Sequence, residues 1–110
     1  VKIMKALLTT IALFISITCL CQITAVHFNA DWNSANDVEW FKKLSDVDLS
    51  TKDISIADIQ ADYKIAVVPT IIIFDDGEEV KRFQADLSFK MVSTKKEVQE
   101  YIDELIISKF

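Results

Sequence analysis

The most informative stretch of this chain of 110 residues is Val67-Val68-Pro69-Thr70-Ile71-Ile72-Ile73-Phe74-Asp75-Asp76-Gly77-Glu78. The continuous apolar run at 71–74 is typical of a strand that is buried on both faces. Gly77 can supply the positive φ that a tight hairpin turn needs. The sequence therefore predicts a buried strand, a turn at 75–78 and a returning strand at 79–84.

Strand signals also lie upstream of this hairpin. Ile23 to Phe28 is rich in β-branched residues and predicts a first strand, and 47–51 predicts a short second strand. Between them a helix is expected over 35–44, with Asn33 or Ser34 as its N-cap. A parallel, right-handed arrangement is expected for this first strand–helix–strand unit.

Two further helices complete the predicted order. One is expected over 56–63, where apolar residues recur at helical spacing after Ser55 as a candidate cap. The other, over 95–106, follows a capping box that begins at Thr94 and ends at Glu97, and it has the clearest amphipathic pattern in the chain. No internal repeat or linker divides the sequence.

The composition excludes several functional classes. Hydrophobic residues make up 51% and charged residues 26%, which is typical of a globular chain and not of a disordered one. The net charge of -5 argues against binding to nucleic acid, whose phosphates it would repel. With one histidine, two closely spaced cysteines and no glycine-rich phosphate loop, the sequence predicts no metal site and no cofactor.

The first 21 residues have the pattern of a secretory signal peptide. Two lysines near the start precede an apolar run at 6–20, and Cys19 and Cys21 stand where small residues precede a cleavage site. Cleavage before Gln22 would leave a domain of residues 22–110, without cysteine, in the periplasm or outside the cell. A retained membrane anchor, a lipoprotein site at Cys19 and a buried core helix are the alternatives.

Two segments of the chain resemble the thioredoxin family. Val26-His27-Phe28-Asn29-Ala30-Asp31-Trp32-Asn33-Ser34-Ala35-Asn36 is similar to its active-site segment, where Phe-x-Ala-x-Trp precedes Cys-x-x-Cys. Tyr63 to Thr70 resembles the segment with the family's cis-proline, and Phe74 to Glu78 resembles the hairpin after it. Across roughly 23–107, the resemblance implies an α/β thioredoxin-like fold with a mixed sheet of about four strands and three helices. The family's first strand and first helix have no counterpart.

The resemblance also assigns site positions, and no catalytic residue is among them. The positions that match the active site are Trp32, Asn33, Ser34, Ala35 and Asn36, those that match the cis-proline loop are Val68, Pro69 and Thr70, and His27 matches a buried acid. Asparagines stand where the family has both cysteines, and an amide cannot attack a disulfide. From the residues themselves, Asn33 is expected to cap a helix or to contact a ligand. His27 is expected in the core with one hydrogen bond.

These observations predict an exported, redox-inactive binding domain whose contact face lies around Trp32, Asn33 and Pro69. The partner would be a protein or peptide, or a second copy, because the missing first strand would leave an open edge at 47–51 and a bare sheet face. The loop 85–93 is the candidate cover for that face. Two alternatives stay open: a thiol–disulfide oxidoreductase that uses Cys19 or Cys21 of an uncleaved N-terminus, and a structural subunit of an envelope assembly.

Overall fold

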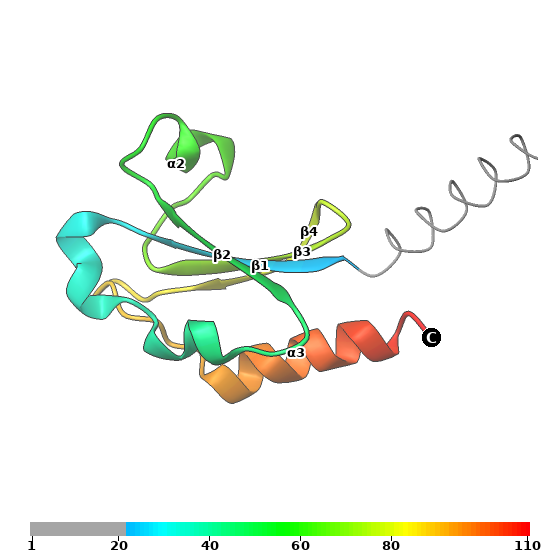
Figure 1. The fold of residues 1–110 in the computed structure, drawn as a ribbon. Helices are drawn as coiled ribbons and strands as arrows, with labels where there is room; N and C mark the ends of the chain where they lie inside the picture. The colour runs from blue at the N-terminus through cyan, green and yellow to red at the C-terminus, as the bar shows by residue number, and fades with distance from the viewer. Residues whose placement is uncertain (1–21) are drawn as a thin grey trace, which may run out of the picture.

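The computed structural model describes residues 22–110, which form a four-stranded mixed sheet with helical segments on both faces (Figure 1). The strand order is β2-β1-β3-β4, and the strands are β1 (Ile23–Asn29), β2 (Asp48–Asp53), β3 (Thr70–Asp75) and β4 (Glu78–Gln84). β1 pairs in parallel with β2 and antiparallel with β3, and β3 and β4 form an antiparallel hairpin. The predicted mixed sheet is confirmed. The predicted signal peptide, with Cys19 and Cys21, lies outside the described residues.

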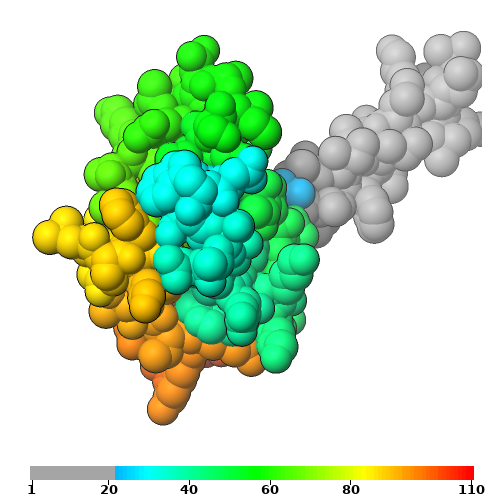
Figure 2. Space-filling model, turned by 90° about the vertical axis from the view of Figure 1, so that its left-hand side faces the viewer, coloured from blue at the N-terminus to red at the C-terminus, as the bar shows by residue number. Residues whose placement is uncertain are grey.

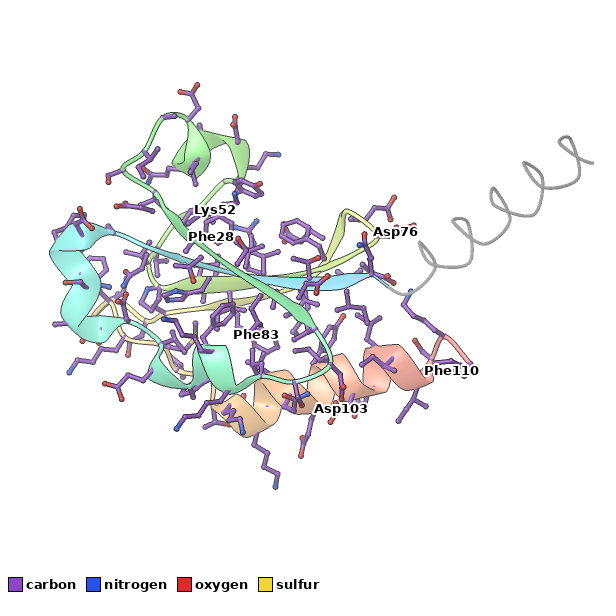
Figure 3. All side chains as sticks on the ribbon, in the orientation of Figure 1. Phe28, Lys52, Asp76, Phe83, Asp103 and Phe110 are labelled. Atoms are coloured by element: carbon purple, nitrogen blue, oxygen red, sulfur yellow. The ribbon has the colours of Figure 1, made fainter. Side chains whose placement is uncertain are left out.

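The two central strands carry the core, as the apolar run predicted. Ile71, Ile72 and Ile73 have no exposed surface, because successive side chains of β3 point into clusters on opposite faces of the sheet. Phe28 and Phe83, which are labelled in Figure 3, belong to these two clusters and lie on opposite faces. A sheet covered on both sides explains why the strand is apolar throughout 71–74.

The predicted hairpin turn is confirmed at Asp76 and Gly77. Both residues have positive φ, 55° and 86°, and they connect the last residue of β3 to the first residue of β4. Two central residues with positive φ are the requirement of a type I′ turn, whose twist matches the twist of the flanking strands.

The C-terminal helix α3 (Lys95–Ile107) also agrees with the prediction, and it lies along the lower face of the sheet in Figure 1. The hydroxyl oxygen of Thr94 accepts a hydrogen bond of 3.2 Å from the backbone N–H of Glu97. Val98 and Ile102 point into the core and are fully buried. A local cap and a local apolar pattern were sufficient to place this helix.

The helix predicted over 35–44 is wrong. The chain forms two 3₁₀-helices instead, η2 (Asp31–Asn36) and η3 (Glu39–Lys43), with extended backbone at Val38 between them. The apolar residues of this stretch, Val38, Phe41 and Leu44, recur every three residues and are all buried. Only Phe41 lies within η3, whereas Val38 and Leu44 flank it with extended backbone.

The helix predicted over 56–63 is reduced to one turn, α2 (Ile59–Asp62). Ser55 does not cap it, because its hydroxyl and its backbone N–H both donate to the carboxylate of Asp53, at 2.6 and 2.9 Å. Hydrogen bonds from β4 hold the α2 segment over the sheet. Arg82 donates to the backbone carbonyls of Tyr63 and Lys64, each at 2.8 Å, and pairs with Glu79.

The predicted bare face is covered within residues 22–110. Val26, Phe28 and Ile72 on this face are buried, and Ile54, Ile59 and Tyr63 pack against them. The loop 85–93 lies at one end of the sheet near Trp32, where its Phe89 lines a groove together with Ile54 and Val68 of this face. β2 is an edge strand of the described sheet, as expected. Among the described residues, no helix combines the length and the apolar character that crossing a bilayer requires.

Candidate functional site

The residues that match the thioredoxin active site meet at one end of the sheet. Figure 2 looks onto this end, with η2 in the middle, the α2 segment above it and the loop 85–93 beside it. The peptide bond between Val68 and Pro69 is cis, as the resemblance implied. Thr70 donates from its hydroxyl to the Val67 carbonyl at 2.6 Å, which fixes the loop before β3. The structure therefore brings η2, the cis-proline loop and the loop 85–93 together.

Asn33 is the centre of this site, although it does not cap a helix. Its side-chain Nδ2 donates to the Oδ1 of Asn29 at 3.0 Å and to the carbonyl of Phe89 at 3.1 Å, and it approaches the carbonyl of Val68 at 3.5 Å. Only 4% of its surface is exposed. The predicted N-cap role is wrong because Ala30 occupies the cap position of η2. The amide binds the protein's own backbone and joins three separate segments.

The hydrogen bonds of Asn33 extend into a network of amides. Asn36, which is half-buried, donates to the Oδ1 of Asn33 at 2.8 Å. Asn29 donates to the backbone carbonyl of Asn33 at 3.1 Å and to the carboxylate of Asp37. Ser34 and Ala35 point outward on η2. Sequence reasoning missed Asn29, Asp37 and Phe89 as site residues, and the only available signal was the concentration of Asn and Asp within a few positions.

Trp32 and Phe89 form an aromatic pair beside an apolar groove. Their ring centroids are 5.1 Å apart in an edge-to-face arrangement, and 66% of Trp32 is exposed. The groove next to them has a volume of about 70 Å³, and its lining consists of Trp32, Ile54, Gln60, Ile65, Ala66, Val67, Val68 and Phe89. An exposed aromatic side chain at the mouth of an apolar groove is suited to hold another apolar side chain.

His27 lies in the core beneath this site. It is 4% exposed, and its ring centroid is 5.3 Å from that of Phe41. The hydrogen bond expected for this residue is not formed at Nε2, which is buried without a partner. Burial lowers the pKa of His27, and the nearby negative charge of Asp37 opposes that shift only in part. The imidazole is therefore neutral at neutral pH, and it borders a cavity of about 410 Å³.

Comparisons with known proteins identify the architecture. No family model and no curated protein matches the sequence. Among solved structures, a thioredoxin mutant from Halobacterium salinarum is 20% identical, with 81% of this chain and 79% of that one covered and a TM-score of 0.60. The reduced thioredoxin pre-protein of Schistosoma mansoni is 21% identical, with coverages of 77% and 80% and a TM-score of 0.61. Fasciola hepatica thioredoxin is 19% identical, with coverages of 84% and 86% and a TM-score of 0.51.

The chain has a thioredoxin-like fold. Because these identities are all low, the likeness establishes only the architecture of the thioredoxin-like domain. What chemistry the domain can perform must be argued from its own residues. Within residues 22–110, no group of three or more histidine, cysteine, aspartate or glutamate side chains is placed to hold a metal ion.

The stability of this thioredoxin-like domain should depend on pH through His27. In the unfolded chain the imidazole titrates near 6.5, whereas in the folded domain its pKa is lower. The unfolded state therefore binds more protons in this range, so stability should fall as the pH decreases from about 6.5 through the folded pKa. We expect His27→Phe, which keeps an aromatic ring against Phe41, to flatten the free energy of unfolding between pH 7.5 and 5.

Urea unfolding at a series of pH values measures this dependence. The carboxyl groups whose pKa is lowered in the fold, those of Asp53, Glu79 and Asp86, start from ordinary values of 3.8 to 4.5 and contribute only in stronger acid. His27 is the only histidine in the chain, so its ring resonances in proton NMR report its pKa directly. An unchanged pH dependence in His27→Phe would assign the effect to other groups.

Proposed function

We propose that this protein is an exported, redox-inactive thioredoxin-like module that binds an extended segment of another protein. The observation that carries the proposal is the buried amide of Asn33, which lies where the resemblance places the nucleophilic cysteine. An amide at this position holds three segments of the site together, but it cannot attack a disulfide as the cysteine thiolate would. Export rests on the pattern of residues 1–21, and the intact mass of the secreted protein tests it.

The absence of a thiol from the domain supports redox inactivity. Disulfide exchange requires a thiolate that attacks sulfur and forms a mixed disulfide. Residues 22–110 contain no cysteine. At the position of the family's second cysteine, Asn36 uses its amide to hydrogen-bond to Asn33. Cys19 and Cys21 lie outside the described residues and would be removed with the signal peptide.

Exposed apolar side chains on η2 and on the loop 85–93 support a binding role. Trp32, Leu87, Phe89 and Val92 are 66%, 95%, 41% and 65% exposed, and all four lie on η2 or on the loop 85–93. Large apolar side chains gathered on one surface usually mark an interaction site. Tryptophan in particular contributes strongly to binding energy when a partner buries it. We define the binding surface as Trp32, Phe89 and the cis-proline loop.

Replacing Trp32 should weaken binding more than any comparable change elsewhere. We expect Trp32→Ala to lower the affinity for an unfolded probe, reduced and carboxymethylated lactalbumin, by about tenfold or more, because it removes the main apolar contact. Isothermal titration calorimetry measures the affinity.

The matched control is Ile107→Ala, which removes another exposed apolar side chain from α3, on a different element of the fold. Its affinity should equal that of the unmodified protein. Equal affinity in Trp32→Ala, or no binding of the probe by the unmodified protein, would contradict the proposed function.

A further inference from the structure

Two strands form the edges of the described sheet, and β2 is the less protected of them. At the other edge, the pairing of β4 with β3 shifts register at Val80, and the backbone carbonyl of Val80 accepts a hydrogen bond of 3.2 Å from the Tyr101 hydroxyl. A register shift and a covering side chain are usual protections of an edge strand. β2 pairs with β1 without a shift from Asp48 to Asp53, and Figure 1 views the sheet from its side.

The pairing with β1 determines which backbone groups of β2 face the open edge. The N–H of Ile54, directly after β2, donates to the carbonyl of Asn29 on β1 at 3.0 Å. The N–H and C=O of one strand residue point to the same side, and successive residues alternate. Residues 50 and 52 therefore also face β1, whereas Leu49 and Thr51 face outward. Within residues 22–110, no hydrogen bond uses these outward groups of Leu49 and Thr51.

A second copy of β2, in antiparallel orientation, matches these groups. A two-fold axis between two copies makes their edge strands antiparallel, and the same residues then meet in both directions. Pairing Leu49 with Thr51 of the second copy uses every outward group of the two residues, because each of the two resulting pairs exchanges two backbone hydrogen bonds. In this register Ser50 lies on the axis, opposite Ser50 of the second copy.

The same register brings opposite charges together. Asp48 lies opposite Lys52 of the second copy, and the symmetry repeats this pair on the other side of the axis. Neither side chain forms an ion pair within residues 22–110. The Cα atoms of such a pair are about 4.5 Å apart, so the two charges can meet. A slide of two residues loses the match, because Lys52 then lies opposite Ser50 or opposite residue 46, which precedes the strand.

We propose that β2 pairs with β2 of a second copy of this chain, antiparallel about a two-fold axis at Ser50, and joins the two sheets into one. Lysine in an exposed edge strand usually discourages pairing with other edges. Here Lys52 excludes unrelated strands and is neutralised by Asp48 of a copy in this one register. Because a single strand pair buries little surface, the dimer exchanges with the monomer and is favoured by concentration. This inference goes beyond the proposed function and does not rest on it.

Sedimentation equilibrium of the full chain, with a thiol reductant and between about 1 µM and about 1 mM protein, tests the association. The weight-average mass should rise with concentration toward twice the mass of one chain. Salt at about 0.15 M, where the Debye length is about 8 Å, screens the repulsion between two chains of net charge -5. The mass of a single chain over the whole range would overturn the inference.

Charge exchange between two positions tests the register. Asp48→Lys and Lys52→Asp each place like charges opposite one another twice, so each should weaken association about tenfold, although they change the net charge in opposite directions. Asp48→Lys/Lys52→Asp makes the opposed charges complementary again and should recover the affinity of the unmodified chain. Thermal unfolding establishes that each variant is folded. Unchanged association in the single variants, or no recovery in the double variant, would overturn the inference.

A cysteine on the proposed axis gives an independent readout. In the Cys19→Ser/Cys21→Ser background, Ser50→Cys would place two thiols opposite each other, with Cα atoms about 4.5 Å apart, which a disulfide can span. Oxidised glutathione should convert this variant to a covalent dimer. Thr51→Cys is the matched control, because diagonal neighbours are about 7–8 Å apart, and it should stay monomeric on a non-reducing gel. Equal crosslinking of the two variants would contradict this register.

Discussion

Urea unfolding of Asn33→Asp is expected to show a loss of about 3 kcal/mol in the free energy of unfolding at neutral pH. The substitution changes almost no volume, but it replaces the amide donor by an oxygen. In the folded protein that oxygen would face the carbonyl of Phe89 at the 3.1 Å position now held by Nδ2, with the carbonyl of Val68 nearby. One oxygen of the buried carboxylate would keep the hydrogen bond from Asn36, but the other would face only acceptors and so destabilise the folded state.

The loss should depend on pH in a definite direction. Repulsion and burial raise the pKa of the introduced carboxyl above its unfolded value. Its protonated form can donate again, so the variant should recover stability as the pH falls through the raised pKa and should lose it as the pH rises. The difference between Asn33→Asp and the unmodified protein should therefore be smallest in acid.

Asn36→Asp is the matched control, because it makes the same chemical change three residues away on the same 3₁₀-helix. Asn36 is half-buried and makes one hydrogen bond, to Asn33. Water can solvate a carboxylate there, so we expect a loss of about 1 kcal/mol or less. Equal losses in the two variants would show that Asn33 has no special role in joining the three segments.

The second large effect is a gain of activity in Asn33→Cys/Asn36→Cys. The two asparagine side chains already meet, with Nδ2 of Asn36 at 2.8 Å from Oδ1 of Asn33. This contact places the two side chains on the same side of η2, and a disulfide requires two Cβ atoms only about 3.8 Å apart. We expect this variant to form a disulfide and to catalyse the reduction of insulin by dithiothreitol, whereas the unmodified protein shows only the uncatalysed rate.

This experiment uses the full chain with Cys19→Ser/Cys21→Ser, so that only the introduced thiols react. Asn33→Ser/Asn36→Ser in the same background removes the amides without adding sulfur, and it should be inactive. A folded double-cysteine variant that stays reduced with oxidised glutathione would show that η2 lacks the geometry of the thioredoxin site. Activity of the unmodified chain that disappears in Cys19→Ser/Cys21→Ser would instead favour the oxidoreductase alternative.

Predictions from the sequence held where the determining interactions are local. The hairpin at Asp76 and Gly77 depends on the backbone of two residues, and the start of α3 depends on Thr94 and the residue three positions later. The buried strand at 71–74 followed from its own apolar run. Each of these signals lies within a few residues of the structure that it specifies, so the sequence displays it directly.

The prediction of a helix over 35–44 was wrong because it relied on candidate capping residues. It did not consider that these side chains could form hydrogen bonds with one another. Asparagine and aspartate side chains in this stretch bind one another and the backbone rather than supporting a continuous α-helix. The spacing of Val38, Phe41 and Leu44 predicted the apolar side of an α-helix, and only the structure shows that Val38 and Leu44 flank a short 3₁₀-helix.

By itself, the sequence determined the order of the strands along the chain, the hairpin, the C-terminal helix and the lack of a thiol in residues 22–110. The tertiary structure alone decided what Asn33 does. Its partner Phe89 lies 56 residues away, on a loop with no periodic signal, and reaches Asn33 only because β3 and β4 carry the chain back across the sheet. A hydrogen bond forms between groups that folding brings together, so a residue type can suggest a cap or a contact, but only the assembled fold selects one.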